Sequence, residues 1–190
     1  MKYDVVIVGA GPAGLFNAYE LITNNPKLKI AILEKGFFVK KRVCPMIKQG
    51  VPCKNCNPCA ILSGYGGAGT FSDGKLNFIP KLGKSDLTKY MSESEAYKLI
   101  DETETIFNKF NMNAEVYPSN LDFASEIRKK VTVAGAKLLK KKKKHLGSDH
   151  LPEYIEGICK FLADKGVSLI ERTDVIDIKT INEEEHEIAY

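Results

Sequence analysis

The spacing of apolar and polar residues divides the start of the chain into strand, turn, helix and strand. The run from Tyr3 to Val8 is apolar and rich in β-branched residues, which is typical of a buried parallel strand. A second apolar run, from Leu28 to Leu33, predicts another strand. Between them, a helical pattern ends at Asn24-Asn25-Pro26, because proline cannot continue a helix. Its expected apolar face comprises Leu15, Ala18, Tyr19, Leu21 and Ile22.

The turn between the first strand and the helix matches the G-x-G-x-x-G pattern of dinucleotide-binding βαβ units. We expect Gly9 to permit the tight turn, Gly11 to let a pyrophosphate approach the backbone, and Gly14 to let the helix pack closely on the strand. Pro12 and Ala13 begin the helix, whose unpaired N–H groups favour a diphosphate. These five residues are the first candidates for cofactor binding.

The second strand is followed by charged residues that also belong to the candidate site. Glu34 is expected to accept hydrogen bonds from an adenosine ribose, and an acid at this position disfavours the 2′-phosphate of NADP. Lys35 and Arg42 are the nearby basic candidates for phosphate contact. For Arg42, a solvated surface charge is an equally good interpretation.

Four of the five cysteines lie close together, with the spacing C-x8-C-x2-C-x2-C. Cys44, Cys53, Cys56 and Cys59 could hold an iron–sulfur cluster or zinc, since closely spaced thiolates converge on one metal. Reduced thiols or a redox pair are the alternatives, because cysteines in a cytosolic protein seldom form structural disulfides.

A second glycine-rich stretch, Gly64 to Asn77, follows the cysteines. Glycines let the backbone lie against a flat or charged ligand, and successive N–H groups can surround an anion. We therefore expect this loop to contact the cofactor through Gly66, Gly67, Ala68 and Gly69. A merely flexible loop is the alternative interpretation.

Further along the chain, three stretches have helical spacing. Residues 86–111 predict one or two amphipathic helices whose aromatic side chains belong to the core, and Ser119 or Asn120 is expected to cap a helix from Leu121 to about Val133. A helix capped by Ser148 or Asp149 is expected to end at Gly166. Its predicted apolar face comprises Leu151, Ile155, Ile158, Cys159 and Leu162.

Five consecutive lysines, Lys140 to Lys144, precede that last helix. A solvated edge strand, whose lysines prevent edge-to-edge pairing, is the favoured interpretation. A nucleic-acid patch is the minority interpretation, because no aromatic residues interleave with the lysines. His145 and His150 are candidates for proton transfer, although capping or surface roles are favoured for both.

Composition adds limits to these expectations. The chain has 190 residues and a net charge of +4, and no apolar run approaches the ~20 residues of a membrane span. With no signal peptide recognised, we expect a cytoplasmic protein that does not bind membranes. The sequence stops within a strand pattern at Tyr190, so we expect it to be the N-terminal portion of a longer protein.

Several of these motifs together resemble one family, the FAD-utilising dehydrogenases or NAD(P)/FAD-dependent oxidoreductases of bacteria and archaea. The residues that carry the likeness are the stretch from Tyr3 to Phe16, Arg42-Val-Cys-Pro, the cysteine loop, Gly66 to Asn77 and His145 to Pro152. The resemblance implies a Rossmann-like α/β fold with a three-layer parallel-sheet core of the glutathione-reductase type, and an inserted helical and loop segment. It also implies that the backbone at Val175 contacts adenine.

Taken together, the residues and the resemblance divide the chain into four expected segments. These are a first βαβ unit (1–36), a cysteine- and glycine-rich cofactor loop (37–85), a helical insertion with an edge strand (86–147), and a helix with strands that return to the sheet (148–190). The resemblance implies an FAD-binding oxidoreductase acting on an unknown small molecule, with NAD(P)H as a candidate electron donor. The alternative is a flavin-dependent tRNA-modifying or other nucleic-acid-binding protein. No catalytic residue is predicted.

Overall fold

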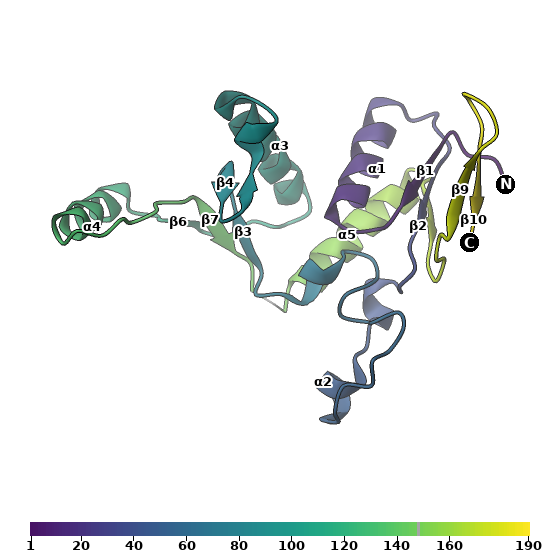
Figure 1. The fold of residues 1–190 in the computed structure, drawn as a ribbon, viewed down its shortest axis with the longest axis horizontal. Helices are drawn as coiled ribbons and strands as arrows, with labels where there is room; N and C mark the ends of the chain where they lie inside the picture. The colour runs from purple at the N-terminus through teal and green to yellow at the C-terminus, as the bar shows by residue number, and fades with distance from the viewer. Residues whose placement is uncertain (148) are drawn as a thin grey trace. The chain divides into compact units, whose positions relative to one another are not determined.

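The chain forms two compact units in a computed structural model that describes residues 1–147 and 149–190 (Figure 1). The first unit comprises Met1–Ser72 and Asp149–Tyr190, and the second comprises Asp73–Ser148. The second unit is thus inserted into the sequence of the first. Among the described residues, no helix has the length and apolar character needed to cross a membrane.

The first unit is built on three parallel strands. β1 (Val5–Val8) and β2 (Ile30–Leu33) pair in register from Val5 with Ile30 to Val8 with Leu33, and β8 (Ser168–Ile170) pairs with the other side of β2. All four β2 side chains are buried, as expected of a central strand in a parallel sheet. The predicted α/β class, with its parallel sheet and βαβ start, is confirmed.

Two helices of the first unit pack against each other. α1 (Pro12–Asn24) buries Leu15, Ala18, Tyr19 and Ile22, which is the predicted face except for the partly buried Leu21. α5 (Leu151–Asp164) buries all five residues of its predicted face. The rings of Tyr19 and Phe161 lie 5.4 Å apart between the two helices. Gly166 follows α5 with a φ of +89°, a conformation that favours glycine after a helix.

Shorter elements complete the first unit. After β2 come the 3₁₀ helix η1 (Val39–Lys41), the short helix α2 (Pro45–Gln49) and the 3₁₀ helix η2 (Ala68–Phe71). β9 (Asp177–Thr180) and β10 (His186–Ala189) form an antiparallel hairpin near the end of the chain.

The second unit contains two small antiparallel sheets and two helices. β3 (Lys75–Asn77) and β6 (Val116–Tyr117) flank β7 (Lys143–His145), while β4 (Lys81–Leu82) pairs with β5 (Ser85–Asp86). After the 3₁₀ helix η3 (Leu87–Lys89), α3 (Glu93–Lys109) begins at a Ser92–Glu95 capping box. α4 (Leu121–Val133) has the predicted bounds, and its first turn is capped by Asn120.

The lysine run differs from its predicted structure. β7 is the central strand of its sheet and not an edge, and the side chain of Lys144 is buried. Its ammonium group lies 3.0 Å from a carboxylate oxygen of Glu104 and donates to Asn108 at 2.7 Å. Lys142 also pairs with Glu104. Lysine can occupy a central strand here because α3 supplies the acceptors that a buried ammonium group requires.

Two other predictions about side chains need correction. Ile106 of α3 is buried, but Tyr90 and Tyr97 are exposed, so the aromatic residues of 86–111 are not uniformly core. His150 occupies the N-cap position of α5 in place of Asp149, and it lies 3.7 Å from the carboxylate of Glu153. Ser148, the other predicted cap, lies outside the described residues.

Candidate functional site: a cleft at the ends of β1 and β2

The glycine turn after β1 has the close packing that its sequence predicts. Gly9 has a φ of +96°, and its N–H donates to the carbonyl of Leu33 at 2.7 Å. A Cβ added to Gly14 would lie 2.0 Å from the carbonyl oxygen of Gly9, so only glycine lets α1 approach the turn this closely. A Cβ added to Gly11 would meet no atom within 4 Å, which leaves open space in front of this residue.

The first turn of α1 presents backbone N–H groups beside that open space. Gly11 is the N-cap and provides no side-chain hydrogen bond, and proline occupies the first helical position. Pro12 and Ala13 are both exposed. An uncapped helix N-terminus with a partial positive charge is suited to bind an anionic group.

Glu34 is a buried carboxylate that accepts three backbone hydrogen bonds. One oxygen accepts from Ala10 at 2.8 Å, and the other accepts from Gly36 at 2.8 Å and from Gly64 at 2.9 Å. The side chain is only 6% exposed. Glu34 therefore ties the G-x-G turn to the second glycine loop, a role that its position in the sequence does not reveal.

Arg42 is buried, so its interpretation as a solvated surface charge is wrong. Its guanidinium donates to the carbonyls of Ala60, Ile61, Tyr65 and Gly67 at 2.7–2.9 Å and to the hydroxyl of Thr70 at 3.2 Å. Burial lowers the pKa of Arg42, while the nearby Glu34 carboxylate opposes that shift. The hydrogen bonds of Arg42 hold the second glycine loop, and a phosphate contact stays a prediction.

The second glycine loop lies directly on the first. Gly66 donates from its N–H to the carbonyl of Ala10 at 2.8 Å. A Cβ added to Gly67 would lie 3.3 Å from the Cα of Gly11, and one added to Gly66 would lie 2.2 Å from the hydroxyl of Thr70. The close approach of the two loops thus explains the glycine at 67, whereas Gly66 leaves room for Thr70 of its own loop.

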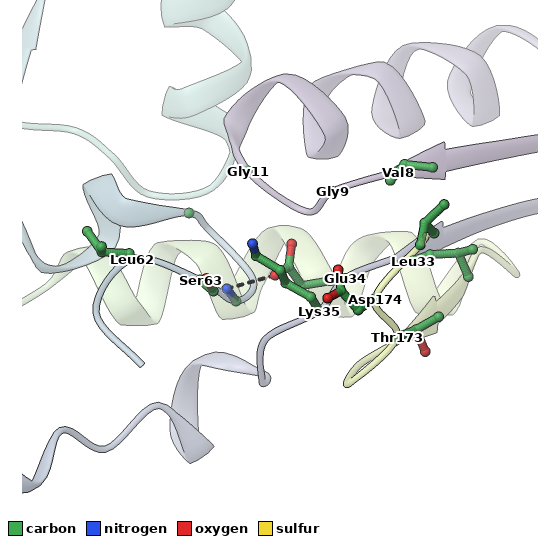
Figure 2. A pocket seen from close by; sticks show the side chains of 13 residues that line it. Val8, Gly9, Gly11, Leu33, Glu34, Lys35, Leu62, Ser63, Thr173 and Asp174 are labelled. Carbon is green, nitrogen blue, oxygen red and sulfur yellow. Dashed lines mark hydrogen bonds between the residues drawn. The ribbon is translucent and has the colours of Figure 1, made fainter. Parts of the chain in front are cut away.

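These segments enclose a cleft of about 390 Å³ (Figure 2). Of the predicted binding residues, Gly9, Gly11, Glu34, Lys35, Gly67 and Val175 line it. Pro12, Ala13, Gly14, Arg42, Gly66, Ala68 and Gly69 are not among its lining residues. Residues that sequence reasoning missed are Val8, Leu33, Leu62, Ser63, Gly64, Thr173 and Asp174.

The lining of the cleft is partly apolar and partly charged. Val8 and Leu62 are 51% and 67% exposed, and such exposed apolar side chains in a concave site suit a flat apolar ligand group. Lys35 and Asp174 are exposed and carry opposite charges. The contribution of Val8 to the cleft could have been predicted from its position at the end of β1. No feature of the sequence predicts the contribution of Leu62.

The segment after β8 joins the cleft through the backbone. The N–H of Thr173 donates to the carbonyl of Glu34 at 2.9 Å, and that of Glu34 donates to the carbonyl of Ile170. These bonds continue the pairing of β2 and β8 beyond the strands, and Val175, two residues after Thr173, lines the cleft.

The four clustered cysteines are not gathered into a metal site. Within residues 1–147 and 149–190, no group of three or more cysteine, histidine, aspartate or glutamate side chains could hold a metal ion. All four thiols are free, with Cys53 and Cys56 exposed and Cys44 and Cys59 partly buried. The predicted iron–sulfur or zinc site is therefore not supported by the structure.

Comparisons with known proteins find sequence similarity over short stretches of the chain. Residues 1–39 match the model of the Thi4 family. A stretch of 33 residues is 67% identical to thiamine thiazole synthase of Coprinopsis cinerea and covers 17% of this chain and 10% of that protein. A stretch of the same length is 64% identical to the mitochondrial L-2-hydroxyglutarate dehydrogenase of Dictyostelium discoideum and covers 7% of its length.

A structural likeness extends over nearly the whole chain at low sequence identity. The crystal structure of Thermovibrio ammonificans THI4 aligns with 98% of this chain and 45% of its own, with a TM-score of 0.43 and 14% identity. The chain thus spans less than half of that structure.

Proposed function

We propose that this chain is the cofactor-binding portion of an FAD-dependent oxidoreductase. The observation that carries the proposal is the cleft in which a G-x-G-x-x-G turn, the end of β2 and a second glycine loop meet. The match of residues 1–39 to the Thi4 family supports it, as do the 33-residue similarities to thiamine thiazole synthase and L-2-hydroxyglutarate dehydrogenase. Redox chemistry would come from the bound flavin, and the substrate is an unidentified small molecule.

The residues of the cleft fit the ADP half of FAD. The open space at Gly11 would admit the pyrophosphate, with the N–H groups of the first α1 turn and the ammonium group of Lys35 as its partners. The exposed side chain of Val8 would contact the adenine, and the backbone at Val175 would meet its edge.

Glu34 has two roles in this proposal. Its carboxylate already accepts three N–H groups, and a carboxylate offers about four acceptor sites, so it retains capacity for a ribose hydroxyl. Its negative charge would repel a 2′-phosphate, which favours FAD over NADP in this cleft.

The nucleic-acid alternative is less well supported. Its basis was the lysine run, yet Lys142 and Lys144 are engaged by Glu104. That pairing reduces the positive charge that a phosphate backbone would meet.

The test is a titration of the chain with FAD, followed by the change in flavin fluorescence, with ADP as competitor. Gly11→Ala is expected to keep the fold, because its φ of −69° suits alanine and the added Cβ meets no protein atom. The same Cβ would stand where the pyrophosphate approaches, so affinity should fall by about tenfold or more. Asn17→Ala, on the exposed side of α1, is the matched control.

Two outcomes would overturn the proposal. One is the absence of saturable FAD binding by the folded chain. The other is FAD binding that neither ADP nor Gly11→Ala weakens, because the ligand would then lie elsewhere.

A further inference from the structure

The segment between α2 and the second glycine loop carries thiols that the cofactor cleft does not use. Cys53, Cys56 and Cys59 are spaced C-x2-C-x2-C, and all three are free. Residues 51–59 contain neither helix nor strand. Because these thiols are not gathered into a metal site among the described residues, they are available to react as thiols.

Cys59 has the environment of a reactive thiolate. The backbone N–H groups of Leu62 and Ile61 hydrogen-bond its sulfur and lower its pKa, and the positive charge of Arg42 acts in the same direction against partial burial. Arg42 is fixed close by, because it donates to the carbonyls of Ala60 and Ile61. The thiolate is the nucleophilic form of cysteine, so these contacts favour reaction at Cys59.

Cys159, a cysteine outside this segment, shows the opposite environment. Cys159 is buried in α5, and burial raises its pKa to about 12. It is therefore an inert thiol at neutral pH and an internal reference for the reactivity of Cys59.

Cys56 is separated from Cys59 by two residues, the spacing of a C-x2-C dithiol. It is exposed, and the chain bends at Asn57 and Pro58, the two residues between the thiols. On the other side of Cys59, a turn is closed by the hydrogen bond from the N–H of Ser63 to the Cys59 carbonyl at 2.8 Å. Cys59 is thus held by a turn, while Cys56 lies in chain without helix or strand, where no ladder of backbone hydrogen bonds opposes the formation of a disulfide.

We propose that Cys59 and Cys56 form a dithiol site that reduces disulfide substrates by thiol–disulfide exchange. The Cys59 thiolate attacks one sulfur of the substrate, forms a mixed disulfide and releases the first substrate thiolate. The Cys56 thiolate then attacks the Cys59 sulfur, forms the Cys56–Cys59 disulfide and releases the second thiolate. The two protons lost by the cysteines go to the two released thiolates, so the dithiol is oxidised as the substrate is reduced.

This activity is separate from cofactor binding. The turn after Cys59 contributes Leu62 and Ser63 to the cleft, but the exchange reaction needs only the two thiols and the substrate. It should proceed in the chain with or without FAD, so a failure of flavin binding and a failure of the dithiol can be told apart.

The experiment treats the reduced chain with oxidised glutathione and follows intact mass and disulfide-mapped peptides. The wild-type chain should lose two hydrogen atoms and gain a Cys56–Cys59 link. Cys56→Ser should accumulate one glutathione on Cys59, because the thiol proposed to resolve the mixed disulfide is absent. Cys59→Ser should slow the reaction of the segment by about tenfold or more. Cys53→Ser, an exposed cysteine of the same segment, is the matched control and should behave as wild type.

Three results would overturn the proposal. These are glutathione on Cys53 or Cys44 in preference to Cys59, a wild-type disulfide that involves Cys53, and thiols that react only after a metal chelator is added. Alkylation of the native chain provides a readout that does not depend on the variants. At neutral pH, Cys59 should be modified before Cys53 and Cys56, while Cys159 stays unmodified until the chain is unfolded.

Discussion

The carboxylate of Glu34 accepts a hydrogen bond from the backbone N–H of Gly64 at 2.9 Å, across 30 positions of sequence. Through this bond, and those from Ala10 and Gly36, one buried side chain fixes the turn after β1, the chain after β2 and the second glycine loop. The shape of the cleft therefore depends on Glu34 before any ligand is bound.

Glu34→Gln should destabilise the first unit. In the wild-type chain, the three N–H groups donate to two carboxylate oxygens. A glutamine amide has only one oxygen, so its NH₂ group would face at least one buried backbone donor. Leaving such a group unpaired costs about 1–3 kcal/mol. Urea unfolding should show this loss, whereas Glu183→Gln, at an exposed position, should leave the unfolding midpoint unchanged. An unchanged midpoint for Glu34→Gln would mean that the three hydrogen bonds add little to stability.

Gly14→Ala and Gly11→Ala should separate packing from binding within one motif. The added Cβ at Gly14 would overlap the Gly9 carbonyl oxygen. Such overpacking typically lowers the free energy of unfolding by about 1–3 kcal/mol. Gly11→Ala should leave the unfolding free energy nearly unchanged while it weakens FAD binding. Equal losses of stability in the two variants, measured by thermal unfolding, would contradict this division of roles.

Arg42→Lys should loosen the second glycine loop even though it keeps the positive charge. A lysine ammonium group has three donors and cannot reproduce the fork that reaches four carbonyls and a hydroxyl. We expect a loss of about 2 kcal/mol or more, since buried carbonyls would lose their partners. Limited proteolysis should cut the variant faster within residues 60–71. Arg128→Lys, on the exposed surface of α4, should cause no change, and an uncut loop in Arg42→Lys would refute the role assigned to Arg42.

Periodicity and motif predicted much of the fold but less of the site. The βαβ unit, α4 and the buried face of α5 were predictable because apolar spacing and helix caps are local signals. The hydrogen bonds of Arg42 and Glu34 were not predictable, because their partners are backbone groups of a loop that only the folded chain brings near. The prediction that Lys144 lies in a solvated edge strand was wrong for a similar reason, since its partner Glu104 lies 40 positions away in the sequence.

The Glu104 and Lys144 pair should make the second unit sensitive to acid. Burial acts against the charged carboxylate, but hydrogen bonds from Lys142 and Lys144 outweigh it and hold the pKa of Glu104 below its ordinary value of 4.5. A lowered pKa in the folded state stabilises the fold above the unfolded value, and the stabilisation is lost as pH falls through the folded value. The free energy of unfolding should therefore decrease below about pH 4.5.

Lys144→Met tests this pair directly. It keeps an unbranched side chain in β7 but removes one of the two cations that Glu104 meets, so the pKa of Glu104 should rise toward its ordinary value. Because Lys142 remains, we expect a loss of about 1–3 kcal/mol at neutral pH. The loss should shrink as pH is lowered, because a protonated Glu104 gains nothing from Lys144. Lys140→Met, at an exposed position of the same run, should leave both the stability and its pH dependence unchanged. A constant difference between Lys144→Met and wild type across the acid range would show that Lys144 acts through packing alone.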